Sequence, residues 1–142
     1  MSSLDYSSLI EEAAAARKFS YSPYSHFRVG AALLCSDGTV YTGCNIENQA
    51  YGPTNCAERT AIFKAVSEGK RDFRAIAIVG GKDAPVWCYP CGVCRQVMAE
   101  FCDPEDFRVI CAVSEEEYRV FTLRELLPEV FRLQPDQDVT GR

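Results

Sequence analysis

The chain has 142 residues, of which 47% are hydrophobic and 25% are charged, and its formal net charge is −5. This length suits one compact domain with a substantial core, and the composition excludes a disordered or fibrous class. The acidic balance disfavours polyanionic partners, so we expect no nucleic acid and no acidic membrane surface as a partner, and favour a small-molecule substrate.

The N-terminal segment and the hydropathy predict a cytoplasmic protein. Residues 1–16 carry acidic side chains and lack the basic start and apolar run of a signal peptide, and no apolar stretch approaches the ~20 residues that a membrane span needs. The eight cysteines of such a chain serve as metal ligands and small buried residues more often than as disulfides. We expect residues 1–133 to form a single domain and the polar tail 134–142 to be mobile.

Hydrophobic periodicity and turn signals predict alternating helices and strands. In chain order they predict a helix over residues 4–18, strands over 27–35 and 40–45, a helix over 56–68, a strand over 74–80, a helix over 91–101, strands over 108–113 and 118–122, and a short helix over 123–127. Short turns make the first two strands, and likewise the last two, antiparallel neighbours. We therefore expect an α/β fold, a three-layer α/β/α sandwich around a five-stranded mixed sheet.

The most specific pattern in the chain combines three cysteines with one glutamate. Cys56-Ala57-Glu58 and Pro90-Cys91-Gly92-Val93-Cys94 both fall where a loop becomes a helix. Three thiolates hold a zinc ion and leave its fourth position open, which is typical of catalytic zinc sites, whereas structural sites close with four protein ligands. A carboxylate two residues from the first ligand can transfer protons. This pattern predicts an enzyme.

Two arginines lie next to these cysteines in the sequence. Three thiolates around Zn²⁺ leave a net charge of −1, which opposes deprotonation of a bound water. Arg59 and Arg95 are placed to donate charge-assisted hydrogen bonds toward sulfur and to restore part of the metal's Lewis acidity. Either arginine could instead be a solvated charge on a helix.

Other interpretations of these residues stay open at this point. Trp87-Cys88-Tyr89-Pro90-Cys91 matches the W-C-x-P-C pattern of thioredoxin-like redox proteins, although a loop with a proline precedes it. A purely structural zinc module needs a fourth ligand, for which Cys88 is the nearby candidate. His26, the only histidine, is expected at a surface or subunit contact.

Several stretches resemble the cytidine deaminase family, specifically its small homotetrameric branch, and the likeness covers about residues 4–131. The matching stretches are residues 24–32, 43–48, 56–61, 90–96 and 125–128. Tyr89, where the family often has a small hydroxyl residue, and Cys88 depart from the family pattern.

This resemblance implies hydrolytic deamination of cytidine and deoxycytidine in pyrimidine salvage. One zinc ion per subunit would be held by Cys56, Cys91 and Cys94, and activated water would attack C4 of the cytosine ring. Glu58 would take the water proton, deliver it to ring N3 and assist the departure of ammonia. A blasticidin-type aminonucleoside deaminase shares the zinc motifs and is the alternative enzyme, although the segment 45–48 favours an ordinary nucleoside.

The resemblance also assigns substrate contacts. Asn45 and Glu47 would hydrogen-bond the ribose hydroxyls, Phe27 would pack against the pyrimidine, and the Ala57 N–H would contact the base carbonyl. Phe27 and Phe131 could otherwise be plain core residues.

Two further aromatic residues bear on the oligomeric state. Tyr51 and Phe131 resemble family positions that reach a neighbouring subunit's pocket. The resemblance therefore implies a homotetramer with pockets shared between subunits.

Overall fold

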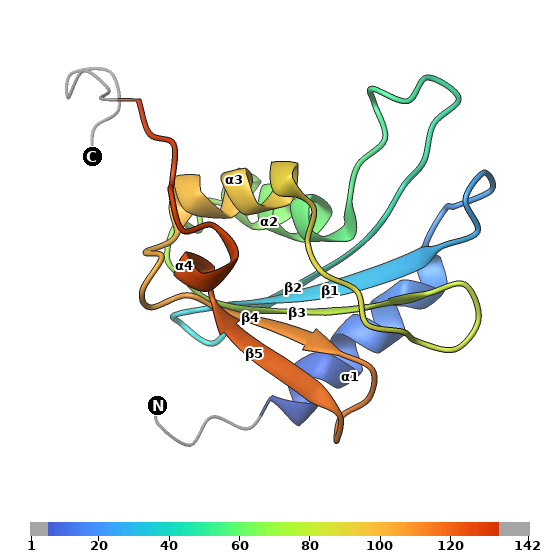
Figure 1. Ribbon diagram of the computed structural model, residues 1–142, viewed down its shortest axis with the longest axis horizontal. Coiled ribbons are helices and arrows are strands. Elements are labelled where there is room, and N and C mark those ends of the chain that lie inside the picture. Colours follow the sequence, from blue (N-terminus) through green and yellow to red (C-terminus); the bar gives the residue numbers. More distant parts are fainter. Residues whose placement is uncertain (1–5, 134–142) are drawn as a thin grey trace.

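The computed structural model describes residues 6–133, which form one mixed sheet covered by helices on both faces (Figure 1). The five strands have the spatial order β2-β1-β3-β4-β5. They span Arg28–Cys35 (β1), Val40–Cys44 (β2), Phe73–Gly81 (β3), Arg108–Ala112 (β4) and Tyr118–Thr122 (β5). Only β3 and β4 pair in parallel; the other neighbours are antiparallel. The predicted five-stranded mixed sheet is confirmed.

The helices divide between the two faces of the sheet (Figure 1). They span Ser7–Ala16 (α1), continued by a 3₁₀ turn over Arg17–Phe19 (η1), Ala57–Ser67 (α2), Gly92–Phe101 (α3) and Leu123–Leu126 (α4). Helix α1 packs on one face alone, whereas α2, α3 and α4 share the core on the other. The predicted three-layer sandwich is therefore confirmed, with element ends that differ by a few residues. Residues 134–142, expected to form a mobile tail, lie outside the described residues.

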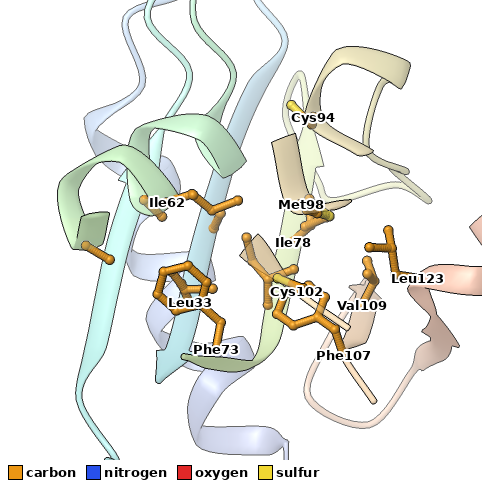
Figure 2. Packing of buried hydrophobic residues seen from close by; sticks show 14 of the residues in the cluster. Leu33, Ile62, Phe73, Ile78, Cys94, Met98, Cys102, Phe107, Val109 and Leu123 are labelled. Atoms are coloured by element: carbon orange, nitrogen blue, oxygen red, sulfur yellow. The ribbon is translucent and has the colours of Figure 1, made fainter. Parts of the chain in front are cut away.

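Alternate residues of the central strands point to the two cores, which explains their continuous apolar runs. On β3, Ile76 and Ile78 face α2 and α3, whereas Ala75, Ala77 and Val79 face α1. Figure 2 shows Ile78 and Leu33 converging with Met98 of α3 and Ile62 of α2 in the first of these cores. The small residues on the opposite face let α1 lie close to the sheet.

Helix α2 lies against β2 where the candidate site begins. A methyl group at Gly43 would lie 2.5 Å from the Ala57 carbonyl oxygen and 2.6 Å from the Ala61 nitrogen. No side chain fits between strand and helix at that point, so the first turn of α2 is seated directly on β2. In the described part of the chain, no helix is both long and apolar enough to cross a membrane.

Candidate active site

Two of the three predicted metal ligands are the N-cap residues of helices. Cys56 precedes α2 and Cys91 precedes α3, both with extended backbone (φ −79°, ψ 158° and φ −70°, ψ 168°), and neither uses its side chain to cap the helix. Cys94 follows within the first turn of α3 and is buried. The N-terminal ends of two helices, with their free N–H groups and positive dipole ends, thus adjoin the sulfur atoms and favour thiolates.

The sulfur atoms are spaced as a zinc ion requires. Cys56 Sγ lies 3.7 Å from Cys91 Sγ, and Cys91 Sγ lies 3.6 Å from Cys94 Sγ. All three sulfurs fall within 4.8 Å of one another. A tetrahedral zinc ion with Zn–S bonds of about 2.3 Å separates its sulfur ligands by roughly 3.8 Å. The three cysteines fit zinc.

The structure supports neither of the two alternative roles of the thiols, a structural zinc site with Cys88 as fourth ligand or a thioredoxin-like redox motif. Among residues 6–133, the side chains close enough together to hold a metal ion are those of Cys56, Cys91 and Cys94, and Cys88 lies outside this cluster. All eight cysteines are free thiols. Strand β3 ends at Gly81 and α3 begins only at Gly92, so the W-C-Y-P-C segment is a loop and does not open a helix directly off a strand.

Hydrogen bonds and charge lower the pKa of one thiol in the cluster. The pKa of Cys56 falls to about 5, first because of the hydrogen bond from Cys94 and then, against the opposing effect of burial, because of Arg59. The same hydrogen bond, together with burial, raises the pKa of Cys94. One thiolate is therefore stabilised by the protein itself, and a divalent cation would stabilise the others.

The two arginines beside the cysteines have different partners. Arg59 Nη2 donates to Cys56 Sγ at 3.2 Å, and Arg59 Nε is buried without a hydrogen-bond partner in the described part of the chain. Arg95 donates instead to two backbone carbonyls, from Nε to Pro90 at 2.8 Å and from Nη1 to Leu126 at 2.7 Å. Arg59 thus supplies positive charge at sulfur, whereas Arg95 connects the ligand loop to α4.

Glu58 occupies the second position of α2 and is only 4% exposed. Burial raises the pKa of its carboxyl group to about 7, and the neighbouring charge of Cys56 acts in the same direction. A group with this pKa both accepts and donates a proton readily near neutral pH. The carboxyl is thus suited to a proton transfer beside the three thiols.

Phe27 and Cys88 meet over Gly80, near the carboxyl end of β3. A methyl group at Gly80 would lie 2.9 Å from Cys88 Sγ and 3.2 Å from Phe27 Cε2. Burial raises the pKa of the Cys88 thiol to about 12, with the charges of Glu58 and Cys56 adding to the effect, so this thiol stays neutral. Phe27, the ring predicted to contact the base, therefore lies near the neutral thiol of Cys88, whose pKa is raised in part by the charge of Glu58.

Asn45 holds the segment that carries Phe27. Its Oδ1 accepts hydrogen bonds from Ser20 Oγ at 2.5 Å and from Val29 N at 2.9 Å, and its Nδ2 donates to the Phe27 carbonyl at 2.8 Å. Within residues 6–133 these bonds use one of the two N–H groups of the Asn45 amide, so the other can donate to a ligand. Asn45 is thus a structural clamp as well as a candidate contact to substrate.

The carboxylate of Glu47 is held by hydrogen bonds from the turn that contains Tyr24 and Ser25, before β1. Its Oε1 accepts from the backbone N–H groups of Tyr24 and Ser25 at 3.0 and 3.2 Å, and its Oε2 accepts from Ser25 Oγ. The Ser25 hydroxyl is the main cause that lowers the pKa of Glu47, so the carboxylate stays ionised. Sequence reasoning missed Ser20 and Ser25, because neither lies in a pattern that marks a partner 20 or more residues away.

A cavity of about 400 Å³ opens beside Glu47. Its walls are Tyr24, Ser25, Glu47, Asn48, Tyr51 and Thr54. The cavity offers hydroxyl groups, an amide and one carboxylate, and none of these lining residues is cationic. Such a wall suits a neutral, hydroxyl-rich ligand better than an anionic one.

The remaining predicted residues divide between the interior and the surface. Ala57 is fully buried as the first residue of α2, where a helix leaves its N–H unpaired. Tyr51 and Phe131 are 86% and 64% exposed, and His26 also lies exposed. Gln96 Nε2 donates to the Phe131 carbonyl at 3.2 Å, which ties this C-terminal segment to α3.

Comparison with known proteins assigns this architecture to a class. Residues 4–112 match the family model of the cytidine and deoxycytidylate deaminase zinc-binding region, and the match includes all three cysteines and Glu58. The fold and the cysteine cluster are therefore those of a zinc-binding deaminase domain.

Among individual proteins that the chain resembles, several are named cytidine deaminase. The chain is 53% identical to a cytidine deaminase of Halalkalibacterium halodurans, over 95% of this chain and all of that protein, and 52% identical to one of Sporosarcina psychrophila, over 90% and 92%. The crystal structure of cytidine deaminase from Burkholderia pseudomallei superposes with a TM-score of 0.81 at 48% identity, covering 90% of this chain and all of that one. The chain belongs to the cytidine deaminase family.

Proposed function

We propose that this protein catalyses the zinc-dependent hydrolysis of cytidine and deoxycytidine to uridine and deoxyuridine, with release of ammonia. The observation that carries the proposal is the convergence of Cys56, Cys91 and Cys94 beside the buried Glu58. The relatives named cytidine deaminase, which match over nearly their whole length, support it.

Glu58 moves protons in the proposed reaction. When bound by the three thiolates, zinc supplies the Lewis acidity that lets water act as a nucleophile near neutral pH. Glu58 accepts the proton that water loses and passes it to ring N3. A second proton, from the hydroxyl group that water leaves on C4, then passes through Glu58 to the departing amine, so that the C–N bond breaks, ammonia leaves and the C4 carbonyl forms. The pKa of about 7 makes both the acceptance and the donation of a proton favourable at physiological pH.

Other residues orient the substrate and tune the cluster. Arg59 offsets the negative charge of the thiolates through its bond to Cys56. Phe27 packs against the pyrimidine, the Ala57 N–H contacts the base carbonyl, and Asn45 and Glu47 bind the ribose hydroxyls. Because Asn45 and Glu47 also fasten the loop around Phe27, base and sugar recognition are mechanically linked.

We further propose a homotetramer with one zinc ion per subunit, acting in pyrimidine salvage. The exposed rings of Tyr51 and Phe131 support contacts between subunits. Zinc ligation by three reduced thiols favours a reducing compartment such as the cytoplasm.

A substrate panel with metal analysis tests the proposed function. Purified protein should contain one zinc per chain and release ammonia from cytidine and deoxycytidine. A cytidine nucleotide should react poorly, because the walls around Glu47 carry no cation for its phosphate. Release from blasticidin S alone would favour the aminonucleoside enzyme, and bound zinc with no turnover on any cytosine nucleoside would favour a structural module.

A further inference from the structure

The loop over residues 82–91 carries the most exposed of the three metal ligands. Of these cysteines, Cys94 is buried and Cys56 half-buried, whereas Cys91 is exposed. Cys91 also precedes the first helical residue of α3: its carbonyl accepts a hydrogen bond from Arg95 N at 3.0 Å, whereas its N–H side continues into the loop. The position of its sulfur therefore depends on the residues that lead into it as well as on the start of α3.

One side chain of the edge strand β5 contacts both large aromatic residues of this loop. The guanidinium carbon of Arg119 lies 4.1 Å from the centre of the Trp87 ring, and Arg119 Nη1 donates to the Tyr89 hydroxyl at 2.5 Å. The Tyr89 ring also packs edge-to-face on Phe121, with 6.0 Å between ring centres. Arg119 and Phe121 are two residues apart on β5 and therefore share one face of the strand.

A second contact holds the same loop to the element that follows β5. Pro90 is buried, and its carbonyl accepts from Arg95, which also donates to Leu126 of α4. Helix α4 begins at Leu123, directly after β5 ends at Thr122. The two residues before Cys91 are thus fastened to one continuous unit, β5 and α4.

We propose that Arg119 is a positioning residue for the metal ligand Cys91, acting by holding Trp87 and Tyr89 against β5. The inference rests on the proposed function only in taking Cys91 as a zinc ligand. It gives a use to the Trp87-Cys88-Tyr89-Pro90 segment, whose aromatic side chains have no part in the proposed chemistry. It also keeps Cys88 turned toward Gly80 and Phe27 rather than toward the metal cluster.

The chemistry of the contact requires arginine. A guanidinium group stacks with its plane on an aromatic ring and still donates from its edge to a second acceptor. A lysine ammonium group keeps the charge but does not make both contacts in one fixed geometry. We therefore expect Arg119→Lys to restore only part of the function that Arg119→Gln loses.

The experiment measures zinc affinity by chelator competition and the emission of Trp87, which is the only tryptophan of the chain. We expect Arg119→Gln to weaken zinc binding about tenfold, within the range for residues that support a metal ligand, and to shift the emission of Trp87 to the red. Turnover of cytidine by Arg119→Gln should recover in excess zinc, with KM near that of the wild type. Tyr89→Phe, which removes only the hydroxyl acceptor, should weaken zinc binding by a smaller factor in the same direction.

Arg124→Gln is the matched control, because Arg124 lies on α4 and pairs with Glu105 rather than with the loop. It should leave zinc affinity and Trp87 emission unchanged. Zinc affinity of Arg119→Gln within twofold of the wild type, or equal losses in Arg119→Gln and Arg124→Gln, would overturn the inference. Should Arg119→Gln fail to fold, Arg119→Lys and Tyr89→Phe decide by the same criterion. A wild-type protein that binds zinc without releasing ammonia overturns the proposed function alone.

Discussion

Single residues around the cysteine cluster differ in burial, and burial determines what each can do. Glu58 is withdrawn from water, so its pKa rises toward neutrality, whereas Glu47 is held by hydrogen bonds that keep it ionised. In the proposed reaction these two carboxyl groups have different roles, proton transfer for Glu58 and hydrogen-bond acceptance for Glu47. The charge of Arg59 acts on the cluster through its contact to Cys56 and also lowers the pKa of Cys94 against the larger effects that raise it.

Replacing Glu58 by glutamine removes the proton carrier and keeps the shape of the side chain. We expect Glu58→Gln to lower kcat about 10²–10⁴-fold, the range for general acid–base catalysis, while zinc content stays at the wild-type level. The measurement follows cytidine absorbance together with metal analysis. Glu12→Gln, at an exposed position of α1, makes the same chemical change and should leave both quantities unaltered. Rapid turnover by Glu58→Gln would remove Glu58 from the mechanism.

Replacing Arg59 tests the compensation of charge at sulfur. Arg59→Gln should weaken zinc binding about 10- to 100-fold, because the Cys56 thiolate loses its charged hydrogen-bond donor. Competition with a chromophoric chelator measures this change. Arg74→Gln, at an exposed residue of β3, is the control for the loss of one positive charge. Equal zinc affinities in the two variants would show that Arg59 has no such role.

At the scale of elements, the site depends on how α2 and α3 meet the sheet. Both helices begin directly after a cysteine of the cluster, and both bury one face in the same core, where Ile62 and Met98 lie over Leu33 and Ile78 (Figure 2). The core therefore fixes the relative placement of two helix starts, and the proposed zinc ion would bind to a geometry that packing has already defined.

The close contact between β2 and α2 at Gly43 allows a direct test of how the sheet positions the start of α2. Gly43→Ala places a methyl group 2.5 Å from the Ala57 carbonyl, so the first turn of α2 must move. We expect a loss of about 1–3 kcal/mol in the free energy of unfolding, measured with denaturant, and weaker zinc binding because Cys56 and Glu58 belong to that turn. Gly52→Ala meets no atom within 4 Å and is the matched control. A Gly43→Ala protein as stable as Gly52→Ala would contradict the close packing described for β2 and α2.

Which features the sequence predicts depends on how far apart the interacting residues lie. The order of helices and strands and the cluster of cysteines are predictable, because Cys91 and Cys94 are neighbours on one helix turn and Glu58 follows Cys56 by two residues. Sequence proximity also gives Arg59 and Arg95 the same expected role, yet only the structure reveals that Arg95 reaches the Leu126 carbonyl, 31 positions away. The bonds of Ser20 to Asn45 and of Arg119 to Tyr89 likewise join residues 25 and 30 positions apart, and no periodic pattern marks either pair.

For the whole molecule, the surface aromatic residues bear on assembly. The Tyr51 ring is 86% exposed at a loop between β2 and α2, and the Phe131 ring is 64% exposed after α4. We expect the protein to sediment as a tetramer, and Phe131→Ser to shift it toward smaller species with a raised KM for cytidine, because the proposed pockets are shared between subunits. Phe19→Ser, at a ring that is 80% exposed elsewhere on the molecule, is the comparison variant. A wild-type monomer with full activity would contradict the proposed assembly.

The central claim is that three cysteine thiolates hold one zinc ion whose fourth position is left to water beside Glu58. X-ray absorption at the zinc edge of the purified protein measures the ligand set directly. We expect three sulfur atoms at about 2.3 Å and one oxygen atom at about 2.0 Å. Four sulfur atoms around zinc, with Cys88 as the fourth ligand, would contradict it.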